Sequence, residues 1–209
     1  MTVDSVADVI NPARISEIVG HVKLCSDDDV DQAIGTAEAA FKTWSRTKAE
    51  DRAERLRDAA RGLRNALPSL ATLFVRENGK TLREAETDIR RSIELIELVA
   101  DDLPEWSKPT VLDQRQPVWA RRRARGVTAV ISPWNSPVLL SFKRFIPAIA
   151  AGNTAVLKPA TNCPLTLIEC VRILAPHFPN GVVTVVTGPG GTAGEKLATD
   201  PRVRAIAFT

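Results

Sequence analysis

Apolar residues recur at spacings of three and four along residues 26–104, which is the period of amphipathic helices. The first helix is expected over 26–44, where Ser26 followed by Asp29 is typical of a capping box. Its buried face would carry Val30, Ala33, Ile34, Ala37, Phe41 and Trp44. The pattern therefore predicts that a helix of several turns opens this region and packs by one face.

Three more helices are expected before the pattern changes. One has its apolar stripe from Ala53 to Leu67 and is interrupted by Pro68, since proline removes a helix hydrogen bond. A short helix over 69–78 follows. The last has its stripe from Leu82 to Ala100 and ends before Pro104. The first hundred residues are thus predicted to be mostly helical.

Two segments outside these helices have the character of strands. Residues 15–25 alternate loosely between apolar and polar positions and contain Gly20, which predicts two short strands with a turn near that glycine. Residues 111–123 read as one exposed strand, and Pro117 marks an edge position because proline cannot donate to a ladder.

From Gly126 onwards, short apolar runs alternate with helical segments. Strands are expected over 127–131, 154–158, 182–186 and 203–208, and helices over 138–151, 164–178 and 191–200. Strands separated by helices of this length require right-handed crossovers, so they form a mostly parallel sheet. The pattern predicts an α/β fold of the doubly wound type.

Composition and charge narrow the class of protein. The 209 residues are 44% hydrophobic and 25% charged, which suits a globular chain with one sizeable core. The net charge of +3 does not indicate nucleic-acid binding. The densest basic run is RRRAR at 121–125, without an interleaved aromatic residue. Its simplest interpretation is the solvated face of a strand, with phosphate binding as the alternative.

The chain carries no pattern of a secreted or membrane protein. Residues 1–16 lack the apolar core of a signal peptide, and no apolar run reaches about 18 residues. Three sparse cysteines indicate a reducing compartment, so a cytoplasmic protein without a membrane or metal site is expected. Cys163 and Cys170 would lie about 10 Å apart on one helix, too far for a disulfide. His21 and His177 have no recognisable acidic or hydroxyl partner and are predicted to be structural.

Candidate ligand-binding residues follow the strands of the parallel sheet, because such sheets bind ligands beyond the carboxyl ends of their strands. In ISPWNSP, Asn135 is either a polar group presented by a stiff turn or the N-cap of the next helix. In LKPAT, Lys158 is either a ligand-facing or a solvated lysine. GPGGTA at 188–193 matches the dinucleotide fingerprint G-x-G-x-x-A, or is simply a tight turn.

Taken together, these motifs resemble the aldehyde dehydrogenase superfamily. The strings SPWNSP, GNTAVLKPAT, PNGVVTVVTGPG and VRAIAFT stand in family order, as do Ile10-Asn11-Pro12, the helix from Ala33 to Trp44 and ENGK at 77–80. The resemblance covers essentially the whole chain. It implies a Rossmann-type parallel sheet with helices on both faces, preceded by an amphipathic helical segment. It assigns 1–110 to the helical part of the cofactor-binding domain, 111–125 to a strand of the oligomerisation segment and 126–209 to the βα units.

The resemblance also implies a reaction. In that family a cysteine thiolate attacks an aldehyde, hydride passes from the resulting oxyanion to NAD(P)⁺, and water hydrolyses the thioester. The asparagine of the PWN motif donates its side-chain amide to the oxyanion, and by carry-over this is the role of Asn135. Such a donor must be fixed before the charge develops. Pro133 and Pro137 restrict the backbone on either side of it.

The implied cofactor is NAD or NADP. The residues carried over to it are Ser132, Pro133, Trp134, Asn135, Lys158, Thr161, Gly190 and Gly191. Lys158 matches the lysine that binds the adenosine ribose, and the two glycines match the turn near the adenine end. The family often has Glu at the position of Thr161, where a carboxylate repels a 2′-phosphate. Threonine removes that repulsion, so NADP remains open beside NAD.

The family's nucleophilic cysteine and general-base glutamate lie beyond the equivalent of Thr209. We therefore expect an incomplete fold that is inactive alone and needs a companion C-terminal chain or forms a homo-oligomer, with a small aldehyde as the substrate of the complete enzyme. The alternative is a non-catalytic module that binds a dinucleotide or another subunit. Cys163, at a helix start that favours thiolate, is a structural cysteine rather than a substitute nucleophile. Cys25 and Cys170 are expected to be small buried residues.

Overall fold

The computed structural model describes residues 6–113, 115 and 118–209. In chain order the elements are β1 (Val6–Asn11), β2 (Arg14–Lys23), α1 (Asp27–Trp44), α2 (Ala49–Asn78), α3 (Leu82–Trp106), β3 (Thr110–Asp113), β4 (Val118–Ala120), β5 (Val127–Ile131), α4 (Pro137–Ala150), β6 (Thr154–Lys158), α5 (Leu165–Leu174), β7 (Val183–Val185), α6 (Glu195–Thr199) and β8 (Val203–Phe208). A 3₁₀ turn at Ala175–His177 extends α5, and a π-helical turn at Gly190–Gly194 precedes α6. Among the described helices, none has the length and apolar character needed to cross a bilayer.

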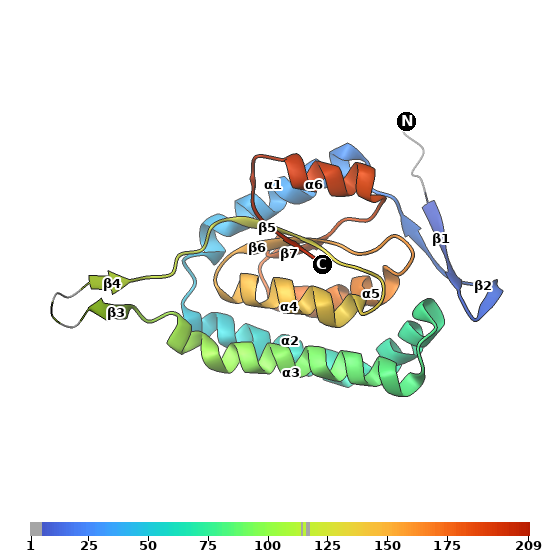
Figure 1. Ribbon diagram of the computed structural model, residues 1–209, viewed down its shortest axis with the longest axis horizontal. Helices are drawn as coiled ribbons and strands as arrows, with labels where there is room; N and C mark the ends of the chain where they lie inside the picture. The colour runs from blue at the N-terminus through green and yellow to red at the C-terminus, as the bar shows by residue number, and fades with distance from the viewer. Residues whose placement is uncertain (1–5, 114, 116–117) are drawn as a thin grey trace.

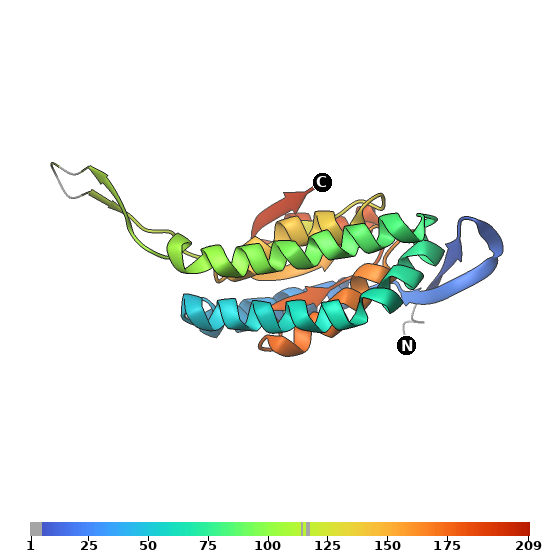
Figure 2. The ribbon, with the colours of Figure 1, turned by 90° about the horizontal axis from the view of Figure 1, so that it is seen from below.

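The molecule is layered around one parallel sheet (Figure 1). Helices α1 and α6 cover one face of the sheet, α4 and α5 cover the other, and α2 and α3 pack outside α4 and α5 (Figures 1 and 2). The strand order is β7-β6-β5-β8, and every pairing in this sheet is parallel. The predicted α/β fold with helices on both faces is therefore confirmed.

Alternate residues of β5 are buried on opposite faces of the sheet. Val127 and Ala129 are buried in the cluster under α1 and α6, whereas Val130 belongs to the larger cluster shared with α2–α5. The three residues are 0–1% exposed, so β5 is covered on both sides. A strand buried on both faces reads as a nearly continuous apolar run, as VTAVI does.

Helix α1 begins as predicted, whereas α2 and α3 extend further than expected. Both reciprocal bonds of the Ser26–Asp29 capping box are present at α1. The interruption expected at Pro68 is wrong, because α2 is continuous over Ala49–Asn78 and its packing against α3 and α5 outweighs one missing hydrogen bond. Helix α3 likewise continues through Pro104, and Arg57 Nη2 donates to the Ala100 carbonyl that this proline leaves free.

The first hairpin differs from the prediction. Its strands are β1 and β2, so the turn lies between Asn11 and Arg14, and Gly20 is inside β2 opposite Val9. The turn is favoured by the Asn11 side chain, whose Oδ1 accepts from the Ala13 amide at 2.9 Å. Pairing across this hairpin places His21 Nδ1 2.8 Å from Asp8 Oδ1, so the statement that His21 lacks an acidic partner is also wrong.

The single strand predicted over 111–123 is instead a second hairpin. Strands β3 and β4 pair antiparallel and form an arm that projects from the layered body (Figure 1). The edge position predicted for Pro117 lies outside the described residues. Residues 121–125 have no regular structure, so RRRAR is an irregular connection into β5 rather than the face of a strand.

Strand β8 lies at one edge of the sheet, beside β5. Ile206 and Phe208 are 48% and 72% exposed on this strand. Strand β8 thus leaves one edge of the sheet and two apolar side chains uncovered by the described residues. An edge of this kind is a surface onto which another strand can pair.

Candidate functional site

The loops after β5, β6 and β7 meet at one edge of the sheet, because parallel strands place their carboxyl ends together. Backbone hydrogen bonds join these loops, from Ser132 N to Lys158 O at 3.2 Å and from Val186 N to Leu157 O at 2.9 Å. The predicted site residues on all three loops are therefore brought to the same edge.

Asn135 is exposed to solvent in the turn after β5, and both ends of this turn are buried. Ser132 and Pro137 are buried, whereas Trp134 and Asn135 are exposed. The alternative that Asn135 caps the next helix is wrong, because Ser136 occupies the N-cap position of α4. The Asn135 side chain makes no hydrogen bond to a described residue, so its amide is available to a ligand.

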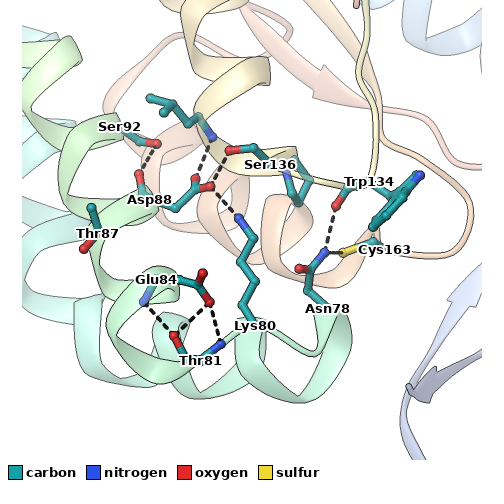
Figure 3. A network of polar contacts seen from close by, with 12 residues as sticks. Asn78, Lys80, Thr81, Glu84, Thr87, Asp88, Ser92, Trp134, Ser136 and Cys163 are labelled. Carbon is teal, nitrogen blue, oxygen red and sulfur yellow. Dashed lines mark hydrogen bonds and ion pairs between the residues drawn. The ribbon is translucent and has the colours of Figure 1, made fainter. Parts of the chain in front are cut away.

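Asp88 holds the downstream side of this turn (Figure 3). Its carboxylate accepts from the Ser136 hydroxyl, from the Leu139 amide at 3.1 Å and from Lys80 Nζ at 2.9 Å. The Leu139 amide belongs to the first turn of α4, where an acidic group is favoured by the helix dipole. Asp88 is 6% exposed, so this network is shielded from water.

Asn78 holds the upstream side of the turn (Figure 3). Its Nδ2 donates to the Trp134 carbonyl at 2.7 Å and contacts Cys163 Sγ at 3.4 Å. Trp134 and Ser136, the two neighbours of Asn135, are therefore each tied to the layer formed by α2 and α3. These two bonds restrict the conformational freedom of the backbone at Asn135, in addition to the restriction from Pro133 and Pro137.

The sequence pattern alone assigns no role to Asn78, Lys80 or Asp88. Asn78 and Lys80 belong to the ENGK string, which was noted only for its order. Asp88 lies on the buried stripe of α3 between Ala85 and Ile89. A lone carboxylate on an otherwise apolar helix face was the signal that could have identified it, because buried charges require partners.

Lys158, at the end of β6, is buried rather than solvated. It is 4% exposed, and its Nζ donates to the carbonyls of Pro159 and Gly188 at 2.9 Å each. Burial lowers the pKa of Lys158 from its ordinary value. An ammonium group has three donors, so one remains for a further acceptor such as a hydroxyl group.

The glycine-rich turn lies beside this lysine. Thr161 Oγ1 donates to the Gly188 carbonyl at 3.1 Å, so Thr161 and Lys158 converge on the same oxygen. A Cβ atom at Gly190 or Gly191 would meet no heavy atom within 4 Å, so both positions face open space. The buried donor of Lys158, next to two glycines that face open space, fits a nucleoside that approaches the backbone closely.

A buried carboxylate secures the loop after β6. Glu77 accepts from the Thr166 amide at 2.8 Å, from its hydroxyl at 2.5 Å and from the Leu165 amide, which satisfies the first turn of α5. Burial raises the pKa of Glu77 from its ordinary value. The end of α2 thereby fixes the start of α5 and the loop that precedes it.

Cys163 has the properties of a structural cysteine. Burial, with Glu77 nearby, raises the pKa of its thiol to about 12, so little thiolate forms near neutral pH. The residue precedes α5, so the expectation that it shares a helix with Cys170 is wrong. Burial also raises the pKa of Cys170, which is fully buried as predicted, whereas Cys25 is half-buried against Thr187.

A hollow of about 300 Å³ lies beside the Asn135 turn, between α3 and the start of α4. Its lining comprises Arg83, Glu84, Thr87, Asp88, Arg91, Ser136 and Leu139. Both carboxylates already have partners, Asp88 as above and Glu84 in the capping box of α3. The side chains of Arg83 and Arg91 form no hydrogen bond or ion pair with the described residues, so their guanidinium donors remain available in the hollow.

Comparison with known proteins places this arrangement in context. The model of the aldehyde dehydrogenase family matches residues 2–209. The chain is 35% identical over 203 residues to a 2,5-dioxopentanoate dehydrogenase of Saccharolobus solfataricus, covering 96% of this chain and 42% of that protein. It is 36% identical over 217 residues to a 1-pyrroline-5-carboxylate dehydrogenase of Anoxybacillus flavithermus, covering 100% of this chain and 41% of that protein.

Solved structures agree with the family match. A glyceraldehyde-3-phosphate dehydrogenase of Methanocaldococcus jannaschii complexed with NADP superposes with a TM-score of 0.92 at 28% identity, over 100% of this chain and 46% of that one. A betaine aldehyde dehydrogenase of Staphylococcus aureus in complex with NAD⁺ gives a TM-score of 0.91 at 28% identity, over 98% and 42%. The chain thus spans less than half the length of these proteins. With its family model, fold and motif order in agreement, this chain belongs to the aldehyde dehydrogenase family.

Proposed function

We propose that the chain is the cofactor-binding part of an NAD(P)⁺-dependent aldehyde dehydrogenase that oxidises an aldehyde to a carboxylic acid. The observation that carries this proposal is the bracing of Asn135. Its amide is exposed and free, while the two neighbouring residues are anchored by the half-buried Asn78 and the buried Asp88. We assign neither the nucleophilic thiol nor the general base of the family to any of residues 1–209.

Asn135 would act as a preorganised hydrogen-bond donor. When a thiolate adds to an aldehyde, negative charge develops on the carbonyl oxygen, and a donor already in position stabilises it without reorganisation. Removing one such donor typically lowers the rate by about 10²–10³. The cross-bracing of Trp134 and Ser136 supplies the rigidity that this role requires.

The dinucleotide would lie along the carboxyl ends of β5 and β6. Lys158 has one unused donor for a ribose hydroxyl, Thr161 offers a hydroxyl without negative charge, and Gly190 and Gly191 leave room for the adenine end. The backbone of 132–135 would line the remainder. The bound NAD⁺ or NADP⁺ supplies the hydride acceptor.

A carboxylate-bearing aldehyde is the substrate class that the observations favour. The two curated relatives are named for 2,5-dioxopentanoate and 1-pyrroline-5-carboxylate, and both names include a carboxylate. The hollow beside Asn135 offers the side chains of Arg83 and Arg91, which have no partners among the described residues. An arginine fork binds a carboxylate through two parallel hydrogen bonds, so either side chain can hold the charged end of such a substrate.

Assembly with further polypeptide is part of the proposal. The edge of β8 exposes Ile206 and Phe208, and the β3–β4 arm exposes Val111, Leu112, Val118 and Trp119. We infer that a companion C-terminal polypeptide covers the first surface and that the arm joins copies in an oligomer. A monodisperse monomer at high concentration by sedimentation would contradict the role given to the arm.

The proposal is tested in two stages. Calorimetric titration of the chain with NAD⁺ and NADP⁺ measures cofactor binding, with Lys158→Met expected to abolish it. The chain is then mixed with the carboxyl-terminal part of a family member, and NAD(P)H formation is followed with 5-oxopentanoate or pentanal as substrate. Asn135→Ala should lower the rate by about 10²–10³.

Variants of the hollow address the substrate. Arg83→Gln/Arg91→Gln should raise KM for 5-oxopentanoate and leave KM for pentanal unchanged. The matched control is Arg90→Gln, an exposed arginine of the same helix that is not part of the hollow. Cofactor binding without any turnover in the mixture would favour the second candidate, a non-catalytic dinucleotide-binding module.

A further inference from the structure

A larger cavity lies at the opposite end of the parallel sheet. Its volume is about 640 Å³, which is within the range of small-molecule sites. The cavity is lined by Phe41, Ser45, Arg46, Thr47, Lys48, Ala49, Arg52, Leu103, Trp106, Ser107, Arg121, Arg122, Arg123, Ala124 and Ala151. Six of these side chains are cationic and none is acidic.

The cavity is separate from the proposed cofactor edge. Ala124 precedes β5, and Ala151 lies between α4 and β6, so the cavity is at the amino ends of these strands. Asn135 and Lys158 lie at the carboxyl ends of the same strands. The cavity and the proposed cofactor edge therefore lie at opposite ends of the strands, and a ligand in this cavity would not occupy the dinucleotide site.

Two of the six cations have structural tasks. Arg52 Nε donates to the Ala150 carbonyl at 2.7 Å, and its Nη1 donates to the Thr47 carbonyl. Arg122 Nη1 donates to the Trp106 carbonyl at 3.3 Å. Ala150 and Trp106 are the last residues of α4 and α3, where free carbonyls favour a cation. These two arginines are explained by the helices that end here.

The other four cations have no such explanation. Arg46, Lys48, Arg121 and Arg123 are exposed, and their side chains form no hydrogen bond or ion pair with the described residues. The acids nearest in sequence, Glu50 and Asp51, are not among the lining residues. Cations gathered in one concave surface create a positive potential that attracts anions, because the protein walls screen less than water.

The connection that carries Arg121 and Arg123 is held in place. Asn153 Oδ1 accepts from the Arg125 amide at 2.6 Å and from the Gly126 amide at 3.1 Å, which fixes its downstream end. Arg122 fixes its middle through the Trp106 carbonyl. The arginines on either side of Arg122 therefore belong to a segment whose position is largely set before a ligand binds.

We propose that this cavity binds a small phosphate-bearing molecule with two or more negative charges, at a site separate from the dinucleotide. Arginine forks match the geometry of phosphate oxygens, and Lys48 adds a compact charge. Trp106 is half-buried in the lining and offers an apolar surface to the organic part of such a molecule. The basic run RRRAR, for which phosphate binding was the alternative to a solvated strand face, would thus contribute to a phosphate site.

The test uses inorganic tripolyphosphate as the probe and the intact chain in calorimetry at fixed ionic strength. Arg121→Gln/Arg123→Gln and Arg46→Gln/Lys48→Gln should each weaken binding about tenfold or more, since charge-assisted hydrogen bonds are lost. The control is Arg90→Gln/Arg204→Gln, which removes two exposed cations elsewhere and should change binding less than twofold. If one cavity variant fails to fold, the other carries the test.

Three results would overturn the proposal. One is absence of tripolyphosphate binding, and another is equal weakening by the control, which would indicate non-specific charge attraction. The third is competition between tripolyphosphate and NAD⁺ or NADP⁺, which would place the probe in the dinucleotide site. Because the readout does not depend on cofactor binding or turnover, the site can be confirmed even if the proposed dehydrogenase function fails.

Discussion

The two ends of the parallel sheet differ in how many of their polar side chains are bonded to other parts of the chain. At the carboxyl end, Asp88, Asn78 and Lys158 are engaged by other parts of the chain, and the bonds they form fix the loops around Asn135. At the amino end, Arg46 and Arg121 face a cavity without partners among the described residues. Paired groups mark where the protein positions its own backbone, and unpaired charges mark where a ligand is expected.

The two ends are candidate sites for different structural reasons. Asn135 is a candidate because both of its neighbours are bonded to the helical layer while its own amide is free. The basic cavity is a candidate because its charges are collected without compensation. The first reason predicts large losses of stability when a bracing group is removed, and the second predicts almost none.

The largest expected effect is the loss of Asp88. Asp88→Ala should lower the free energy of unfolding by about 3–5 kcal/mol, because it leaves Lys80 and the Leu139 amide without their buried acceptor. Urea denaturation followed by circular dichroism measures the change. Asp101→Ala, which removes an exposed partner of Arg57, is the control and should cost several-fold less. Equal losses of unfolding free energy in the two variants would contradict the bracing role given to Asp88.

The reactivity of Cys163 gives the next effect. Since its thiol pKa is raised to about 12, the thiolate fraction at pH 7.5 is far below that of an ordinary cysteine. Allowing for the higher nucleophilicity of a more basic thiolate, iodoacetamide should modify Cys163 on the order of 100-fold more slowly than a free cysteine peptide.

The pH dependence has a definite sign. Below the raised pKa, the rate at Cys163 should increase with pH, approaching its limit only near pH 12. Mass spectrometry of the chymotryptic peptide follows the modification, and the urea-unfolded chain is the control that should react at the ordinary rate. Rapid labelling in the folded chain would show that the carboxyl-end network is open.

Thr161 should affect cofactor choice about tenfold. Thr161→Glu places a carboxylate beside the position expected for the 2′-phosphate, so the ratio of NAD⁺ to NADP⁺ affinity should increase by about that factor. Thr161→Gln has a similar size without charge and should leave the ratio nearly unchanged. Calorimetric titration with both dinucleotides measures it. If the ratio of NAD⁺ to NADP⁺ affinity were unchanged in Thr161→Glu, Thr161 would not lie beside the adenosine ribose.

The smallest effect is expected at the amino end. Arg46→Gln/Lys48→Gln should change the free energy of unfolding by less than about 0.5 kcal/mol, because the removed groups are exposed and bond to no described residue. The same urea denaturation as for Asp88 provides the comparison. A loss near that of Asp88→Ala would mean that these cations support the fold and are not held for a ligand.

The sequence by itself determined the class of fold and predicted where a candidate site lies. Strand and helix periods predict the order β5-α4-β6-α5-β7-α6-β8, because burial on both faces leaves apolar runs and burial on one face leaves a stripe. The motif order indicated the family and pointed to Asn135, Lys158 and the glycine turn. Local rules failed at Pro68 and Pro104, where packing of long helices outweighs one lost hydrogen bond.

Only the tertiary structure decided which groups meet. Asp88 is 48 positions from Ser136, and Asn78 is 56 positions from Trp134, so neither bond has a signature in local spacing. The same holds for the basic cavity, where Arg46 and Lys48 join Arg121 and Arg123 because α1 and α3 end at the same side of the sheet. Periodicity reports which face of an element is buried, whereas side-chain bonding depends on how the layers stack.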